Sequence, residues 1–243
     1  MQDDRLDLFQ QKVQKRRYSG EGFRSSIDAC KINISLLKAL SFDLDGTLFR
    51  KGLDDIFWNE RIPSLLANKE GIPFNEAQRF LFDEYKKIGE SDPRWYIPEY
   101  WFNRLDLDVP VQDVLSSVNY RDGIYEDANL LHEFAKDYSI IICTNNARSM
   151  LSHKIKLMDS ANCISHTFSS VSDFKETVKN RHFYRQVCTH LAVRPDQVLH
   201  IGDDPIHDFE EPHAEGVNAI LIDREGKSNT IHTLHDLHAI LNG

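Results

Sequence analysis

Two aspartates, Asp43 and Asp45, stand two residues apart in the stretch ALSFDLDGTLFR, at the end of an apolar run. Carboxylates this close repel each other, and one of them would normally hold a proton. A bound cation, or a reaction that uses both groups, would justify the pair. One carboxylate could attack an electrophile while the other transfers a proton, which is nucleophilic catalysis with general acid–base assistance.

Other apolar runs of the chain also end in polar residues. Thr144 and Asn145 follow one run, Asp203 and Asp204 follow another, and Asp208 comes shortly afterwards. A hard cation such as Mg²⁺ takes its oxygen ligands from one or two carboxylates, a substrate phosphate and water. Such an ion would neutralise the acidic group and keep the first aspartate ionised at neutral pH, ready to act as a nucleophile.

The elements that position these residues are short and mostly apolar. Strand-like runs occupy residues 37–44, 138–144, 164–169, 198–201 and 219–222. Amphipathic stretches lie between them, for example at residues 129–134, 150–158 and 182–191. This alternation indicates an α/β fold with a Rossmann-like parallel sheet and helices on both faces. Ligands of such sheets bind beyond the carboxyl ends of the strands, where Asp43, Thr144 and Asp203 are expected to meet.

A long segment separates the first two predicted strands. A parallel crossover needs only about a dozen residues, so we interpret residues 52–118 as an inserted helical cap domain. Its clearest helix is predicted at residues 75–88. Four aromatic residues follow in the stretch RWYIPEYWFNRL, and they either form the core of this helical module, which we favour, or line a substrate pocket: Trp95, Tyr96, Tyr100 and Trp101.

Composition narrows the classes of partner. The chain has 243 residues and a net charge of −9, which argues against nucleic acid or an anionic membrane surface. No apolar stretch approaches the roughly 20 residues that span a bilayer. The start, MQDDRLDLF, lacks the pattern of a secretory signal, and the four cysteines are widely spaced. We therefore expect a cytoplasmic protein with reduced cysteines, either a monomer or a homodimer.

Residues 1–36 are predicted to form an N-terminal extension outside the domain. Leu6, Phe9 and Val13 recur at helical spacing and precede a basic run and a glycine-rich turn. A solvated helix is the preferred interpretation, and a docking arm is the alternative.

Three motifs together resemble a known family. Phe42-Asp43-Leu44-Asp45-Gly46-Thr47-Leu48, the pair Thr144-Asn145 and the later Gly202-Asp203-Asp204-(x)3-Asp208 resemble the haloacid dehalogenase superfamily of phosphatases, in the family's own order. The resemblance covers residues 37–223 and implies an α/β core at residues 37–51 and 119–243, with a helical C1-type cap at residues 52–118. It also implies Mg²⁺ as the cofactor and a small phosphorylated metabolite as the substrate.

The resemblance assigns a role to each motif residue. Asp43 would be the nucleophile that becomes an aspartyl phosphate, and Asp45 would be the general acid/base, with its main-chain carbonyl on Mg²⁺. Thr144 would act in catalysis and, with Asn145, bind the phosphoryl group. The implied magnesium ligands are Asp43, Asp45, Asp203 and Asp204. Asp204 or Asp208 could instead support the metal or the family's lysine from behind.

The family's lysine is the one position that departs from the pattern. The usual spacing before the Gly-Asp pair lands on Val178, which cannot do the work of a lysine. The neighbouring Lys179 is the preferred catalytic and substrate-binding residue, and Lys175 is the alternative.

The sequence thus predicts a magnesium-dependent phosphatase that hydrolyses a small phosphorylated metabolite through an aspartyl phosphate. A phosphotransferase or phosphomutase of the same superfamily is the main alternative. A dehalogenase needs no magnesium and would leave Asp45, Asp203 and Asp204 unexplained. A receiver domain is shorter and has no insert after its first strand. A phosphate-binding protein without activity would have no use for the proton transfer assigned to Asp45.

Overall fold

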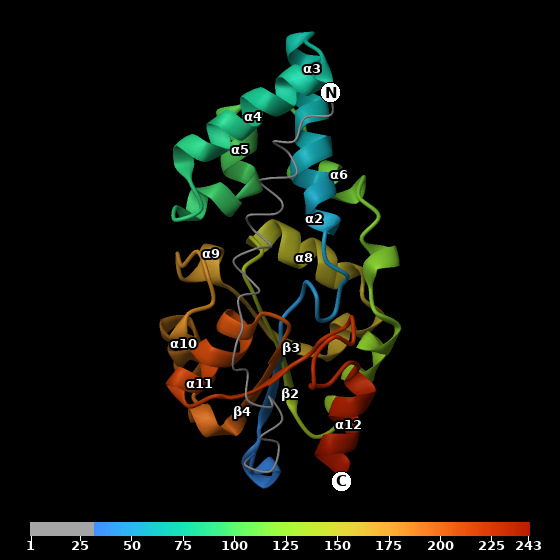
Figure 1. Ribbon diagram of the computed structural model, residues 1–243, viewed down its shortest axis with the longest axis vertical. Helices are drawn as coiled ribbons and strands as arrows, with labels where there is room; N and C mark the ends of the chain where they lie inside the picture. Colours follow the sequence, from blue (N-terminus) through green and yellow to red (C-terminus); the bar gives the residue numbers. More distant parts are fainter. Residues whose placement is uncertain (1–31) are drawn as a thin grey trace.

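A five-stranded parallel sheet lies at the centre of the protein in the computed structural model, which describes residues 32–243 (Figure 1). The strands lie in the order β3-β2-β1-β4-β5. Their bounds are Ala39–Phe42 (β1), Ser139–Thr144 (β2), Ile164–Ser169 (β3), Val198–Gly202 (β4) and Asn218–Leu221 (β5). The predicted α/β fold is confirmed, and each expected strand is present with its ends shifted by a few residues at most.

Helices cover both faces of the sheet, as the strand pattern predicts. The helices that follow β1 to β5 within the core are α7 (Leu131–Phe134), α8 (Arg148–Leu157), α9 (Ser170–Asp173), α10 (Arg181–Leu191), α11 (Glu211–Glu215) and α12 (Leu234–Asn242). Short helical turns precede or join them: η5 (Arg121–Gly123), η6 (Glu126–Leu130), η7 (Asp159–Cys163), η8 (Pro195–Gln197) and η9 (Pro205–Glu210). None of the helices within residues 32–243 combines the length and the apolar character needed to cross a membrane.

The alternation of side chains along the strands separates two apolar layers. Ala39 and Ile141 pack with residues of α10, whereas Leu40 and Ile142 belong to the larger cluster that includes residues of α8 and α12. Successive side chains of a strand point to opposite faces, so one strand contributes to both layers. Helices α8 and α10 therefore lie on opposite faces of the sheet.

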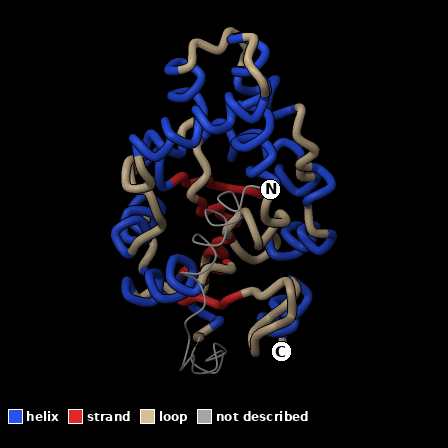
Figure 2. Tube along the Cα trace, turned by 45° about the horizontal axis from the view of Figure 1, so that its top comes forward, coloured by secondary structure: helices blue, strands red, loops and turns tan. Residues whose placement is uncertain are grey.

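The segment between β1 and β2 forms a helical insert, which begins at α2 (Leu53–Ile56) and ends at α6 (Val111–Ser116). Between these two helices lie η3 (Phe57–Arg61), α3 (Ile62–Glu70), α4 (Phe74–Ile88), η4 (Pro93–Tyr96) and α5 (Pro98–Arg104). Figures 1 and 2 show this group of helices at one end of the molecule, beyond the sheet. The buried apolar residues of the insert are continuous with the α8 side of the sheet.

The aromatic stretch of the insert packs mainly inward. Trp101 is fully buried, its indole N–H donates to the carbonyl of Trp95 at 3.1 Å, and its ring lies 4.5 Å from that of Tyr85. The core interpretation is therefore confirmed for Trp101. Trp95, Tyr96 and Tyr100 are half-buried. The motifs predicted in the N-terminal extension, including Leu6, Phe9 and Val13, lie outside the described residues.

Candidate active site

The carboxyl ends of three adjacent strands bring the motif residues together. Asp43 follows β1, Thr144 ends β2 and Asp203 follows β4. Because β1 lies between β2 and β4, these residues share one edge of the sheet. The Asp43 N–H donates to the carbonyl of Ile201 at 2.8 Å, which fixes the start of the first motif against β4.

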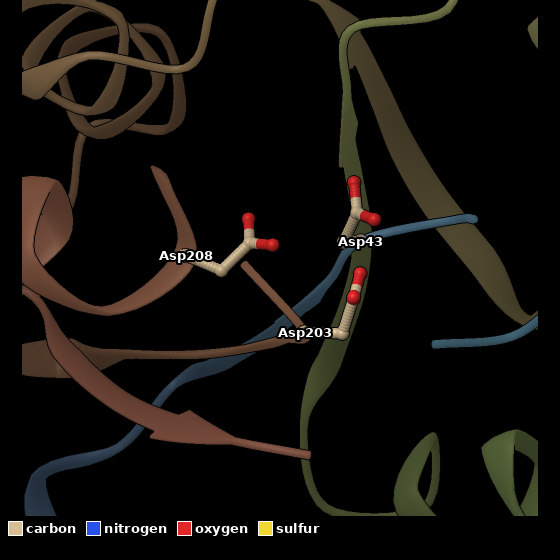
Figure 3. A group of neighbouring side chains, drawn as sticks. All are labelled: Asp43, Asp203 and Asp208. Atoms are coloured by element: carbon tan, nitrogen blue, oxygen red, sulfur yellow. The ribbon is translucent and has the colours of Figure 1, made fainter. Parts of the chain in front are cut away.

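Three carboxylates form an acidic cluster at this edge. One oxygen from each of Asp43, Asp203 and Asp208 lies within 4.8 Å of the other two, and Figure 3 shows the Asp208 carboxyl group pointing toward the other two. Two glycines make room for the cluster. A Cβ atom on Gly46, whose φ is 87°, would lie 2.4 Å from an Asp203 oxygen, and one on Gly202 would lie 2.3 Å from the Asp208 carboxyl carbon.

Lys179 contacts two of the three carboxylates of this acidic cluster. Its side chain is 3% exposed, and its amine contacts the Asp43 carboxylate, Asp208 at 2.6 Å and the carbonyl of Cys143 at 3.3 Å. Burial alone would lower the pKa of Lys179, but the two carboxylates outweigh burial and raise it. The amine therefore stays charged. The alternative lysine, Lys175, is exposed, and its amine donates to the carbonyl of Ser172 at 3.0 Å.

Asp208 is held by partners behind the cluster. It is almost fully buried, lies 2.9 Å from Nε2 of His200 and accepts a hydrogen bond from the Asp204 N–H at 3.0 Å. Burial would raise the pKa of Asp208, but Lys179 and His200 together lower it. Burial lowers the pKa of His200 and favours a neutral ring. Its Nε2–H then donates to Asp208, while Nδ1 accepts from the Ser41 hydroxyl at 2.9 Å.

The electrostatics of the Asp43 side favour a bound cation. Burial raises the pKa of Asp43 to about 7; Lys179 opposes this rise, and the charge of Asp208 adds to it. A divalent cation beside the carboxylate would favour the ionised form. The donors of the cluster are carboxylate oxygens, which are the ligands that Mg²⁺ prefers. The residues present therefore fit a magnesium site.

Asp203 and Asp204, which are also predicted magnesium ligands, contact other groups of the protein. Asp203 contacts the Lys51 amine, which places a positive charge beside this carboxylate. One oxygen of Asp204 accepts from the N–H groups of Ile206 at 2.9 Å and His207 at 3.0 Å, so it caps the start of η9. The magnesium role of Asp204 stays a prediction.

The predicted phosphate-binding pair ends β2. Thr144 is 1% exposed, and its hydroxyl accepts from the Asn146 N–H at 3.2 Å. The Asn145 amide oxygen accepts from the Ser170 hydroxyl at 2.9 Å. These bonds fix the loop that leads from β2 to α8, so its polar groups are set before a ligand arrives.

Asp45 belongs to a second charged group that the sequence analysis missed. The Lys154 amine contacts both Asp45 oxygens, at 2.7 and 2.8 Å, and it also contacts Asp54 at 2.8 Å. The Asn146 amide N–H donates to Asp45 at 2.7 Å. One signal for Lys154 was available in the sequence, because it shares the apolar face of the predicted helix with Met150 and Met158 at a spacing of four residues.

This geometry agrees with what comparisons of the whole chain find. The sequence pattern of a hydrolase family, the haloacid dehalogenase-like hydrolases, matches residues 37–210. The chain belongs to this family. Membership makes the chain a hydrolase of the haloacid dehalogenase superfamily, and the match spans all the motif residues from Asp43 to Asp208.

A characterised relative matches a smaller part of the chain. The GMP/IMP nucleotidase YrfG of Escherichia coli strain K12 is 31% identical over 67 residues, which is 28% of this chain. The match covers 30% of the length of that nucleotidase.

Solved structures of the superfamily share the fold over most of the chain. A haloacid dehalogenase-superfamily phosphatase from Thermococcus onnurineus superposes with a TM-score of 0.69 at 24% identity, covering 85% of this chain and 99% of that one. The hydrolase YfnB from Bacillus subtilis, solved with bound magnesium, superposes with a TM-score of 0.55 at 18% identity, covering 85% and 99%. At these identities the similarity shows the fold.

Proposed function

We propose that this protein is a magnesium-dependent phosphomonoesterase that acts on a small phosphorylated metabolite through an aspartyl phosphate. The observation that carries the proposal is the separate environment of the two motif aspartates. Asp43 lies with Lys179 and the acidic cluster, and Asp45 lies two residues away with Lys154 and Asn146. Because the two carboxylates have separate partners, they can take different roles, one attacking phosphorus and the other transferring a proton.

Asp43 is the nucleophile in this proposal. Its oxygen attacks the phosphorus atom, and the bond between phosphorus and the leaving oxygen breaks. Lys179 is positively charged and contacts Asp43, so it lowers the repulsion between this carboxylate and a phosphate dianion. Thr144 and Asn145 lie at the same edge of the sheet and donate to the phosphoryl oxygens.

Asp45 is the general acid/base. In its protonated form it donates a proton to the leaving alcohol, and as a carboxylate it then removes a proton from the water that attacks the aspartyl phosphate. Water attack releases inorganic phosphate and restores Asp43. A phosphotransferase would use the same base on a second alcohol in place of water, so the acceptor of the phosphoryl group distinguishes the two reactions.

Asp43 and Asp203 would hold the magnesium ion, together with the main-chain carbonyl of Asp45. When bound, Mg²⁺ supplies positive charge that offsets the acidic cluster and the phosphoryl oxygens. Asp208 and Asp204 support this site from behind: Asp208 holds Lys179 and the Asp204 N–H, and Asp204 caps η9.

Residues 52–118 are proposed to act as a cap over the site. The helices of this insert lie beyond the sheet (Figure 1), and both chain connections to the core contact Lys154, whose amine also contacts Asp45. A cap of this kind excludes water and restricts which esters reach the nucleophile.

A phosphate-release assay tests the proposed function. The purified protein is incubated, with and without Mg²⁺, with p-nitrophenyl phosphate and a panel of natural esters. GMP and IMP come first because of the nucleotidase match, followed by sugar phosphates, phosphoglycolate and phosphoserine. We expect magnesium-dependent release from at least one natural ester, and none from the Asp43→Asn variant. Phosphoryl transfer to an added sugar in place of phosphate release would favour the phosphotransferase.

A further inference from the structure

Lys154 is a buried charge that the proposed mechanism does not use. Its side chain is 0% exposed, although it comes from the middle of α8. Burying an unpaired ammonium is strongly unfavourable, so its partners explain why it is there. The Lys154 amine contacts Asp45 and Asp54, and the amide oxygen of Asn146 at 2.9 Å. All of these partners are oxygen atoms, and none belongs to α8.

The partners come from separate parts of the fold. Asp45 follows β1 in the core, and Asn146 follows β2. Asp54 lies in α2, where the chain enters the insert. The Tyr120 ring lies 5.1 Å from the Lys154 amine, just after α6, where the chain returns from the insert. Lys154 therefore contacts both connections of the insert as well as the motif aspartate.

We propose that Lys154 is a positioning residue, which fixes the Asp45 carboxylate for proton transfer and ties it to Asp54 at the base of the insert. The inference rests on the proposed function, because it concerns how Asp45 performs its assigned role. Lys154 contacts both Asp45 oxygens, and Asn146 donates to one of them, so this carboxylate is restrained from two sides. A general acid must lie within hydrogen-bond reach of the leaving oxygen, which requires such restraint.

The charge balance explains why Lys154 cannot be replaced by a neutral residue without consequence. Asp45 and Asp54 are two carboxylates that share this one ammonium. The Lys154 amine contacts oxygens of both carboxylates, so its positive charge is compensated by these two groups. A neutral side chain would leave both carboxylates without their shared cation, and Asp45 would lose the contact that orients it.

The same geometry links the insert to the chemistry. The two connections of the insert also touch each other, because the side chain of Leu53 packs directly over the backbone of Gly123. A shift of the insert relative to the core would move Asp54 and Tyr120 with respect to Lys154. The position of the insert and the orientation of Asp45 are therefore coupled through one side chain.

The test compares two esters of different leaving-group quality in the full-length protein with Mg²⁺. An alkyl phosphate needs the proton from Asp45, whereas p-nitrophenolate leaves without one. We expect Lys154→Met to lower kcat for the alkyl phosphate by about 10²-fold, within the range of about 10²–10⁴-fold that general acid–base catalysis contributes. For p-nitrophenyl phosphate the loss should be smaller, with KM unchanged for both esters.

Three variants control the comparison. Lys156→Met removes an exposed lysine from the same helix and should leave both reactions unchanged. Lys154→Arg keeps the charge and should restore part of the alkyl phosphatase activity; it also serves if the methionine variant does not fold. In the Asp45→Asn background, Lys154→Met should cause no further leaving-group-dependent loss, because residues that act as a unit are not additive.

The outcomes separate this inference from the proposed function. An equal loss on both esters, or a full additional loss in the Asp45→Asn background, would assign Lys154 a purely structural role and overturn the inference. The alkyl phosphate is the natural ester of the panel that the wild type hydrolyses fastest, and a wild-type protein that hydrolyses no ester of that panel would overturn the proposed function, and the inference with it.

Discussion

The two motif aspartates are neighbours in sequence but belong to differently built halves of the site. Asp43 contacts Lys179, which precedes α10 on one face of the sheet, and Asp45 contacts Lys154 of α8 on the opposite face. Each carboxylate thus has its own buried ammonium. The repulsion expected between them is reduced because their counter-charges come from opposite sides of the sheet.

The two halves differ in the charge that remains once each aspartate is paired with its lysine. On the Asp43 side, the three carboxylates of the acidic cluster share two ammonium groups, those of Lys179 and Lys51, so one negative charge remains. This half favours a divalent cation. On the Asp45 side, Lys154, Asn146 and Asp54 surround the carboxylate with protein groups and connect it to the insert. In the proposed function, one half would hold the ion and the other would transfer the proton.

The comparison is tested most directly by exchanging each aspartate for its amide. Asp43→Asn should abolish turnover of every ester, because the amide cannot act as the nucleophile. Asp45→Asn should lower hydrolysis of an alkyl phosphate by about 10²–10⁴-fold and that of p-nitrophenyl phosphate by less. The aspartyl phosphate should persist in Asp45→Asn, since no base activates water. Parallel assays of both esters, with mass spectrometry for the added phosphoryl group, measure these effects.

If Asp43→Asn still hydrolyses either ester while Asp45→Asn loses both equally, the roles are wrong. The pair would then serve only to hold a cation.

Removal of magnesium tests the Asp43 half, which contains the acidic cluster. Chelation with EDTA should abolish phosphatase activity, and added Mg²⁺ should restore it. Asp203→Asn should raise the Mg²⁺ concentration needed for half-maximal activity, because one charged ligand is lost. Asp204→Asn is the matched variant, since its carboxylate caps η9 and should affect metal dependence less. Metal titrations in which Asp204→Asn shows the larger shift would transfer the ligand role to that residue.

Lys179, the lysine of the Asp43 half, should contribute more to activity and stability than Lys175. Lys179→Met should lower kcat by about 10²–10³-fold, as expected for loss of one electrostatic group at the reacting centre. It should also reduce the free energy of unfolding by about 3–5 kcal/mol, because Asp208 keeps a buried charge without its ammonium partner. Lys175→Met should change neither quantity. Steady-state kinetics and denaturant unfolding check both variants, and a large loss in Lys175→Met would contradict the assignment.

The sequence predicts more of the Asp43 half than of the Asp45 half, for physical reasons. Strand periodicity places Asp43, Thr144 and Asp203 at one edge, since parallel strands end together. Spacing alone did not decide whether Lys179 or Lys175 is the family's lysine. The fold brings Lys179 into contact with Asp43. Lys154 was missed because its partners Asp45 and Asp54 are 109 and 100 residues away along the chain. Contacts of that separation follow from tertiary packing, which local patterns do not encode.

The helical insert shows the same limit of local sequence patterns. Its helical character followed from residues 75–88, which form most of α4, and from the length of the segment. That its apolar core is continuous with one face of the sheet did not follow, because helix periodicity says which face is buried and not against what.

The smallest effect on activity is expected for Asp54. Its substitution should change the pH dependence of stability while activity stays nearly unchanged. Burial raises the pKa of Asp54 to about 6; Lys154 opposes this rise, Asp45 adds to it, and Tyr120 also faces the group. Between about pH 4 and pH 6 the folded protein therefore holds a proton that the unfolded chain releases, so this site makes stability fall as pH rises. The total decline is at most about 3 kcal/mol, at about 1.4 kcal/mol per pKa unit.

Asp54→Asn removes this titration while Lys154 keeps its contacts with Asp45. The difference in unfolding free energy between variant and wild type should be flat below about pH 4, shift in favour of the variant up to about pH 6, and be flat again above. Turnover at neutral pH should change by only a few-fold, because the general acid/base keeps its orienting ammonium. Asp113→Asn, an exposed aspartate of the same insert, is the control. Denaturant unfolding at several pH values measures the difference, and a shift in the opposite direction would mean that ionised Asp54 stabilises the junction through Lys154.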